Sequence, residues 1–164
     1  MSHVRYIDKT RDYYLSQGYD KPYRWANFDD VPFTPLNKPL SESRLALVST
    51  SEIALRSWKD QRTPLEKGER GNVYSFPADT PLDDLYSQTH SFNKYATTLD
   101  DVNAYFPVTR LQEFAAAGRI ASLSPNVHGV YNAYSQRKTP EKDAPELLRR
   151  LRADAVDVVL LTPV

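Results

Sequence analysis

The sequence predicts an α/β fold, an incomplete three-layer sheet of parallel strands (flavodoxin- or Rossmann-like) preceded by an extended arm rich in proline and aromatic residues. Compact apolar runs at residues 45–50 and 156–164 have the character of buried parallel strands. In the second half, helix patterns are followed within a few residues by strand patterns, which favours right-handed crossovers. The length of 164 residues suits one ordinary domain.

The first 43 residues are predicted to form a helix and an extended arm, and residues 44–164 the α/β domain. Apolar residues at helical spacing predict the helix over residues 3–17, with Gly18 as its end. Between residues 19 and 40 prolines recur too densely for a regular helix or a central strand. This arm is expected to be anchored on its own domain, or alternatively on a partner, by three aromatic side chains, those of Trp25, Phe28 and Phe33.

The predicted domain begins with a strand at residues 45–50, which runs into a polar Ser/Thr turn. A short strand is predicted at residues 73–76, where Pro77 closes it. Pro107 favours the first turn of a helix that Gly118 ends. The apolar face of this helix comprises Val108, Leu111, Phe114 and Ala115.

A short strand at residues 120–123 follows directly, and a second helix comes later. Asp143 and Glu146, three residues apart, predict a capping box at the start of that helix. The last strand, residues 156–164, is apolar on both faces and is expected to need a covering helix on each side. We interpret the sequence as cut off at this strand; the alternative is that strand and chain end together at a sheet edge. The core-facing residues of the second helix recur at i, i+3, i+4 and i+7, namely Ala144, Leu147, Leu148 and Leu151.

Composition argues against several function classes. The 21 basic and 21 acidic residues give no electrostatic reason to bind nucleic acid or an anionic membrane. The amino terminus lacks the apolar core of a signal peptide, and no apolar run approaches the roughly 20 residues that span a bilayer. A cytoplasmic protein is therefore expected. Without cysteine, the 164 residues hold no disulfide, thiolate nucleophile or cysteine-bound metal.

Two groups of residues are candidates for chemistry. His90 precedes Asp101 and Asn103 by about a dozen residues, and an imidazole beside a carboxylate or amide could move protons. The alternative is a loop that these side chains hold together by hydrogen bonds. His128 is expected just beyond the carboxyl end of the strand at residues 120–123, the side of a parallel sheet where ligands bind. No metal site is predicted.

Five segments, taken in order, carry a resemblance to one family. They are residues 44–51 (RLALVSTS), 76–79 (FPAD) followed by His90, 101–111 (DVNAYFPVTRL), 117–120 (AGRI) and 154–162 (DAVDVVLLT). Together they resemble the first part of selenoprotein B of the glycine, sarcosine, betaine and D-proline reductases.

The resemblance implies an oxidoreductase that cleaves a carbon–nitrogen bond of a small amine or amino acid, linked to a dithiol/disulfide couple. In this family the last strand leads into a selenocysteine or cysteine, with a cysteine a few residues later. The chain would then be the amino-terminal part of such a selenoprotein, inactive in redox chemistry by itself. Partner reductase subunits, one with a pyruvoyl group, and an oligomeric assembly are also implied.

By the same resemblance, His90, Asp101 and Asn103 would act in catalysis, and Ser49, Ser51 and His128 would bind substrate. The chain departs from the family at Glu52 and at residues 91–93, where the family has glycine or a glycine-rich step. Substrate identity is therefore not carried over. The alternatives are a non-catalytic α/β binding or assembly subunit and a small-ligand binding domain without chemistry.

Overall fold

The computed structural model describes residues 5–22, 24, 26–58, 72–90, 92–131 and 135–163. The chain divides into two compact units, Met1–Thr34 and Pro35–Val164. No helix in the described part of the chain is both long and apolar enough to cross a membrane.

The first unit contains one helix. The predicted amino-terminal helix is observed as α1 (Tyr6–Ser16), and Gly18 adopts φ +85° just after its end. None of the helix residues is buried. The described residues between 19 and 34 form no helix or strand, as the prolines predict. Trp25, one of the predicted anchors, lies outside the described residues.

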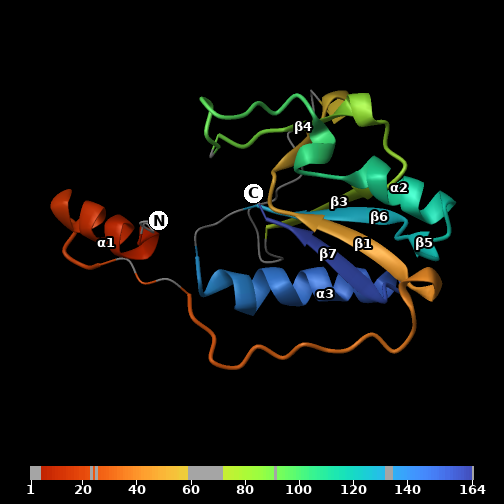
Figure 1. Ribbon diagram of the computed structural model, residues 1–164, viewed down its shortest axis with the longest axis horizontal. Coiled ribbons are helices and arrows are strands. Elements are labelled where there is room, and N and C mark those ends of the chain that lie inside the picture. The colour runs from red at the N-terminus through yellow and green to blue at the C-terminus, as the bar shows by residue number, and fades with distance from the viewer. Residues whose placement is uncertain are drawn as a thin grey trace. The chain divides into compact units, whose positions relative to one another are not determined.

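The second unit is built on a five-stranded sheet (Figure 1). β1 is its central strand, with β7 on one side and β5 and β6 in succession on the other, because Leu45 pairs with both Leu123 and Val158. These pairings are parallel, whereas β3 joins the outer side of β6 in the antiparallel sense. The strands are β1 (Arg44–Ser49), β3 (Val73–Pro77), β5 (Ser122–Leu123), β6 (Asn126–Val130) and β7 (Val158–Thr162).

The predicted α/β class and the mostly parallel sheet are confirmed, with two differences in detail. The strand expected at residues 120–123 is observed only at Ser122–Leu123, and the longer β6 that follows was not predicted. The strand expected at residues 73–76 is β3, which lies antiparallel to its neighbour. A short apolar run predicts a strand but does not reveal the direction in which it pairs with its neighbour.

Two helices cover opposite faces of this sheet (Figure 1). On the face of α2 (Val108–Ala116), Leu45 and Leu47 pack in the main core. On the face of α3 (Ala144–Ala153), a smaller cluster joins Ala46 and Val48 to the helix. This alternation is the two-residue period of a strand buried on both faces. Short helical turns occur at Leu40–Glu42, Arg56–Trp58, Leu82–Asp84, Val102–Ala104 and Thr139–Asp143.

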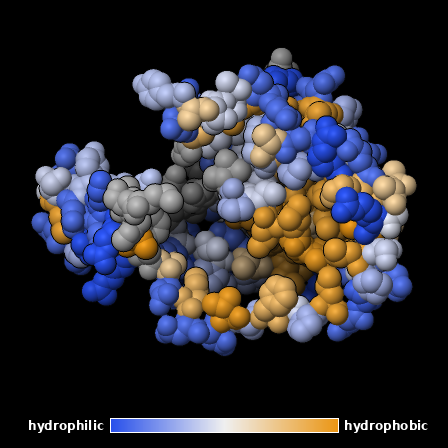
Figure 2. Space-filling model, viewed as in Figure 1, coloured by the Kyte–Doolittle hydropathy of each residue, from blue (hydrophilic) through white to orange (hydrophobic). Residues whose placement is uncertain are grey.

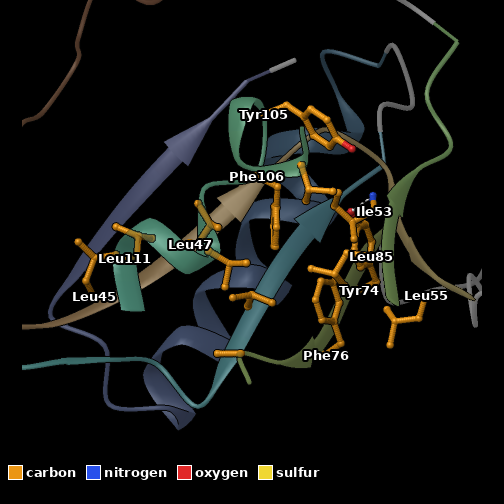
Figure 3. Close-up of a cluster of buried hydrophobic side chains, with 14 of the residues drawn as sticks. Leu45, Leu47, Ile53, Leu55, Tyr74, Phe76, Leu85, Tyr105, Phe106 and Leu111 are labelled. Atoms are coloured by element: carbon orange, nitrogen blue, oxygen red, sulfur yellow. Dashed lines mark hydrogen bonds between the residues drawn. The ribbon is translucent and has the colours of Figure 1, made fainter. Parts of the chain in front are cut away.

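The main core extends under a separate antiparallel ribbon, β2 (Ile53–Leu55) and β4 (Leu85–Ser87). Figure 3 shows Tyr74, Phe76 and Phe106 packed inside it. The Tyr74 hydroxyl accepts a hydrogen bond of 2.7 Å from the amide of Ile53, which ties the ribbon to the sheet. The ring itself lies over Gly129, where any side chain would collide with it.

The start of α3 differs from the predicted capping box. The Asp143 side chain makes no capping hydrogen bond, and instead it accepts the amide of Asn72 at 2.8 Å. Glu146 binds the guanidinium groups of Arg149 and Arg150, each at 2.8 Å. A wide helical turn at Thr139–Asp143 precedes α3 and carries the chain into it, so no side-chain cap is needed at Asp143.

Some residues predicted to be buried are exposed instead. Of the expected core face of α3, Leu147 and Leu151 pack on the sheet, whereas Ala144 and Leu148 are exposed. β7 is an edge strand among the described residues, and its Leu160 and Leu161 are 37% and 65% exposed. Figure 2 shows apolar side chains gathered on this side of the molecule. The sequence predicted that β7, apolar on both faces, needs a covering helix on each side, and within the described residues Leu160 and Leu161 remain partly or largely uncovered.

Candidate active site at the carboxyl ends of β1 and β7

The central strand and its edge neighbour end side by side. In the parallel register of β1 and β7, Ser49 lies opposite Thr162, so the two carboxyl ends are level. In open parallel sheets, ligands bind just beyond such ends. This edge of the sheet is accordingly where a functional site is best sought.

Two buried serines organise this edge. Ser49 and Ser51 are 1% and 0% exposed, and their Oγ atoms are 2.8 Å apart. The Ser49 hydroxyl also lies 3.0 Å from the carbonyl oxygen of Thr162, and it accepts the Ser51 amide at 3.1 Å. Ser49 thus joins the turn after β1 to the last residue of β7.

The turn after β1 contains backbone strain. Glu52 adopts φ +52°, the left-handed region that favours glycine. The carbonyl oxygen of Glu52 accepts the Gln88 amide at 2.9 Å, which holds the turn against the strand β4. The geometry explains why glycine would suit this position, where the chain has Glu52. A side chain is tolerated here at a cost in backbone energy.

The ribbon strand β4 adds further hydroxyl groups. The Ser87 hydroxyl donates to the carbonyl oxygen of Ser51, and the Thr89 amide donates to Ser87 Oγ at 3.1 Å. Thr89 is 8% exposed. His90 comes directly after it and is exposed. We call the four hydroxyl-bearing residues Ser49, Ser51, Ser87 and Thr89 the hydroxyl cluster. His90 is the next residue in the chain after Thr89 and can be reached from solvent.

Asp101 and Asn103 are occupied by local hydrogen bonds. Asp101 caps the helical turn at Val102–Ala104, because its Oδ1 accepts the Asn103 amide at 3.0 Å. Asn103 Oδ1 accepts the hydroxyl of Thr109 at 2.9 Å. Within the described residues, no hydrogen bond or ion pair joins His90 to either side chain. The alternative in which these side chains hold a loop together accounts for the contacts of Asp101 and Asn103.

Asp101 also borders a cavity of about 370 Å³ next to the ribbon. The Arg56 guanidinium lies over the Tyr86 ring at 5.1 Å on one side of it. One arginine and three aspartates line the cavity together with apolar residues, a mixture that suits a small polar ligand. The lining residues are Arg56, Leu82, Asp83, Leu85, Tyr86, Leu99, Asp100, Asp101 and Val102.

His128 lies elsewhere, and its expected placement is wrong. It is in the middle of β6 rather than beyond a strand end, and it is 1% exposed. Its register partner is Val48, so its side chain lies on the α3 face, opposite to that of Ser49. Burial lowers the pKa of the imidazole below its ordinary value, and the Asp154 carboxylate opposes this change. The structure therefore does not bring His128 together with the two serines.

Sequence reasoning missed Ser87 and Thr89, which complete the hydroxyl cluster. The signal was present in the alternation of residues 85–89, where one face of the strand carries the hydroxyl groups before His90. This alternation was not recognised as a strand because the ribbon is short: its partner strand β2 is only three residues long. In the described part of the chain, no three histidine or acidic side chains converge to hold a metal ion.

Comparison with known proteins identifies relatives among reductase subunits. The D-proline reductase subunit gamma of Acetoanaerobium sticklandii is 29% identical over 134 residues, which cover 79% of this chain and 52% of that protein. The glycine reductase complex component B subunit gamma of Symbiobacterium thermophilum is 27% identical over 148 residues, or 88% of this chain and 34% of its own length. The same subunit of Carboxydothermus hydrogenoformans is 26% identical over 136 residues.

These relatives confirm the resemblance to the selenoprotein B reductases. The chain spans about half the length of the first of them and about a third of the other two. No family model matches the sequence. No solved structure matches it either.

Proposed function

We propose that this chain forms the α/β scaffold of a gamma-type subunit in a reductase of the D-proline and glycine reductase kind, and that it works with partner subunits. The observation that carries the proposal is the similarity to two such gamma subunits over 79% and 88% of the chain. The reaction would be the reductive cleavage of a carbon–nitrogen bond in a small amine or amino acid, linked to a dithiol/disulfide couple.

The reactive selenol or thiol would stand at the carboxyl end of β7. The 164 residues contain no cysteine, so this group would come from sequence outside them or from a partner. A position after Thr162 would adjoin Ser49, because the Ser49 hydroxyl lies 3.0 Å from the Thr162 carbonyl oxygen. Ser49 and Ser51 would then shape the substrate side of the reactive atom, and His90, one residue past the hydroxyl cluster, would exchange protons with solvent.

Asp101 and Asn103 would take part through the loop they order. Asp101 borders the 370 Å³ cavity, whose acidic rim would attract the ammonium group of an amine substrate. Asn103 would hold the loop that presents Asp101, through its bond to Thr109. A pyruvoyl group, if the assembly uses one, would belong to a partner subunit.

The decisive experiment is intact mass spectrometry and selenium analysis of the native protein, combined with the codons that follow Val164. We expect a species heavier than 18.8 kDa that carries selenium, or a cysteine in the corresponding place. A native species of 18.8 kDa without selenium would overturn the placement of the reactive group in this polypeptide and leave a partner subunit as its source. If that species co-purified with reductase subunits, it would support the alternative of a non-catalytic assembly subunit.

A pair of serine substitutions tests the placement of the site in the complete assembly. Ser49→Ala should lower reductase turnover at least tenfold, because it removes the link between the β1 turn and β7. Ser43→Ala is the matched control. Ser43 is also 0% exposed, but it lies at the opposite end of β1, where its hydroxyl donates to the carbonyl of Pro39 at 2.9 Å. Equal turnover in both variants would remove Ser49 from the site.

A further inference from the structure

One ring nitrogen of His128 has no partner among the described residues. Nδ1 lies 2.7 Å from Ser75 Oγ, but the buried Nε2 makes no hydrogen bond to the part of the chain that the structure describes. The nearest carboxylate oxygen, Asp154 Oδ2, is 3.6 Å from Nε2. This distance is too long for a hydrogen bond and short enough for a strong electrostatic interaction.

The contacts of Ser75 indicate which nitrogen carries the proton. The guanidinium of Arg150 can only donate, and its Nη1 donates to Ser75 Oγ at 2.9 Å. The Ser75 hydroxyl proton is then free to be donated to Nδ1 of His128. In the neutral imidazole the remaining proton is consequently on Nε2, on the side of Asp154.

The hydrogen bonds to the Asp154 carboxylate come from neutral groups. Ser124 Oγ donates to it at 3.2 Å and Asn126 Nδ2 at 3.0 Å. Arg44 binds the backbone carbonyl of Asp154 at 2.8 Å rather than the carboxylate. Within the described residues, no lysine or arginine side chain pairs with this carboxylate.

The hollow that His128 helps to line offers no spare charge for a ligand. It has a volume of about 230 Å³, and both guanidinium groups on its rim are already bound to Glu146. Among the described residues, the group that can bring a positive charge next to the Asp154 carboxylate is the imidazole of His128 itself, by taking up a proton. The polar and charged groups that line this hollow with His128 are Ser75 from β3, Asn126 from β6, Arg149 and Arg150 from α3, and Asp154 from the turn after α3. Glu146 of α3 pairs with both arginines.

We propose that His128 and Asp154 form a proton-operated clamp between β6 and the turn that leads from α3 into β7. A proton added to Nδ1 makes the imidazole a cation, and Nε2–H then closes onto Asp154 Oδ2 as a charge-assisted hydrogen bond. Such bonds are about 2.7–2.9 Å long, so the turn moves toward β6 by a little under 1 Å. Ser75, which no longer donates to Nδ1, accepts from both His128 and Arg150.

The clamp closes only below the ordinary pKa of histidine. Burial lowers the pKa of His128 from 6.5, Asp154 raises it, and Arg150 lowers it further. Closure is accordingly expected below pH 6.5. The proposal does not depend on the reductase function, because it concerns the α3 face of the sheet, opposite the side chain of Ser49.

A nuclear magnetic resonance titration of residues 1–164 between pH 8 and pH 4 tests the clamp. We expect the His128 ring resonances to titrate below pH 6.5, and the backbone amides of residues 154–157 to shift with the same midpoint. Asp154→Asn should move the His128 midpoint down by about one pH unit, a tenfold loss of proton affinity. Ser124→Ala is the control, because it removes a neutral contact to Asp154 and leaves the charge in place.

Two results would overturn the proposal. One is a His128 midpoint that is the same in the parent and in Asp154→Asn. The other is a set of turn amides that do not follow the His128 titration. If Asp154→Asn does not fold, His128→Gln gives the same test, since the acid-induced shifts at residues 154–157 should disappear in that variant.

Discussion

Replacing Gly129 with alanine should destabilise the α/β unit by about 3 kcal/mol. A Cβ atom at this position would lie 1.9 Å from Cζ and 2.1 Å from Oη of Tyr74. The ring has little room to withdraw. It is 4% exposed, its centroid is 6.3 Å from that of Phe76 and 4.8 Å from that of Tyr131, and its hydroxyl accepts the Ile53 amide.

The magnitude combines two costs. Overpacking of a filled core costs about 1–3 kcal/mol. Moving the ring also removes the partner of the buried Ile53 amide, which costs about 1–3 kcal/mol. Opposing these, alanine in a strand is favoured over glycine by about 0.5–1 kcal/mol. The sign of the effect is therefore the test, since without the collision Gly129→Ala would stabilise the protein.

The assay is urea denaturation of residues 1–164, followed by circular dichroism and extrapolated to water. A Tyr74→Leu background is the control. Leucine has no ring over Gly129, so adding Gly129→Ala there should cost less than about 1 kcal/mol, and the two substitutions should be coupled by more than about 1 kcal/mol. An unchanged or raised stability of Gly129→Ala alone would refute the close packing of the Tyr74 ring on Gly129.

The remaining predictions concern stability measured in the same way. Phe106→Ala, at a side chain 0% exposed, should cost about 3–5 kcal/mol, whereas Phe114→Ala, at one 38% exposed, should cost far less. Ala155→Gly should stabilise by about 0.5–1 kcal/mol, because Ala155 ends α3 at φ +52°, where alanine is strained. Glu52→Gly should give a similar gain for the same reason, and a loss would reveal a contact made by the Glu52 side chain. Because the folded-state pKa of His128 lies below 6.5, its stabilising contribution is complete above pH 6.5 and is lost as pH falls; His128→Gln should flatten that part of the pH profile.

The elements that could be predicted from the sequence are those with a strong apolar pattern and clear end signals. β1 and α2 are both of this kind, since an apolar run leads into a polar turn at β1, and α2 lies between Pro107 and Gly118. β6 was missed because its central residues, His128 and Gly129, do not predict a strand. Gly129 is present because the Tyr74 ring occupies the space of its side chain, a tertiary requirement that sequence spacing cannot express.

The candidate site was predictable in position but only partly in composition. Parallel register places the ends of β1 and β7 together; the apolar pattern predicted both strands, but not that they are neighbours in the sheet. The two partners of His128, Ser75 and Asp154, come from separate segments that stand 53 and 26 residues away from it in the chain. Nothing local in the sequence marks such a group, because each member is an ordinary residue of its own element.

β7 connects Asp154, the partner of His128, with Ser49 at the other end of the strand. A change at one end of β7 should nevertheless not be transmitted to the other end. Asp154 lies in the turn before the strand, and Thr162 at its far end adjoins Ser49. Five consecutive register pairs to β1, from Leu45–Val158 to Ser49–Thr162, hold the strand between them. A shift of one residue would turn every side chain to the opposite face, so β7 cannot slide in response to a displacement of under about 1 Å at its start. Movement of the turn should therefore be absorbed near Ala155, where the backbone leaves the helix at positive φ. The consequence can be measured: Ser49→Ala should leave the His128 titration midpoint unchanged, and a midpoint that moved with it would show that the strand transmits strain along its length.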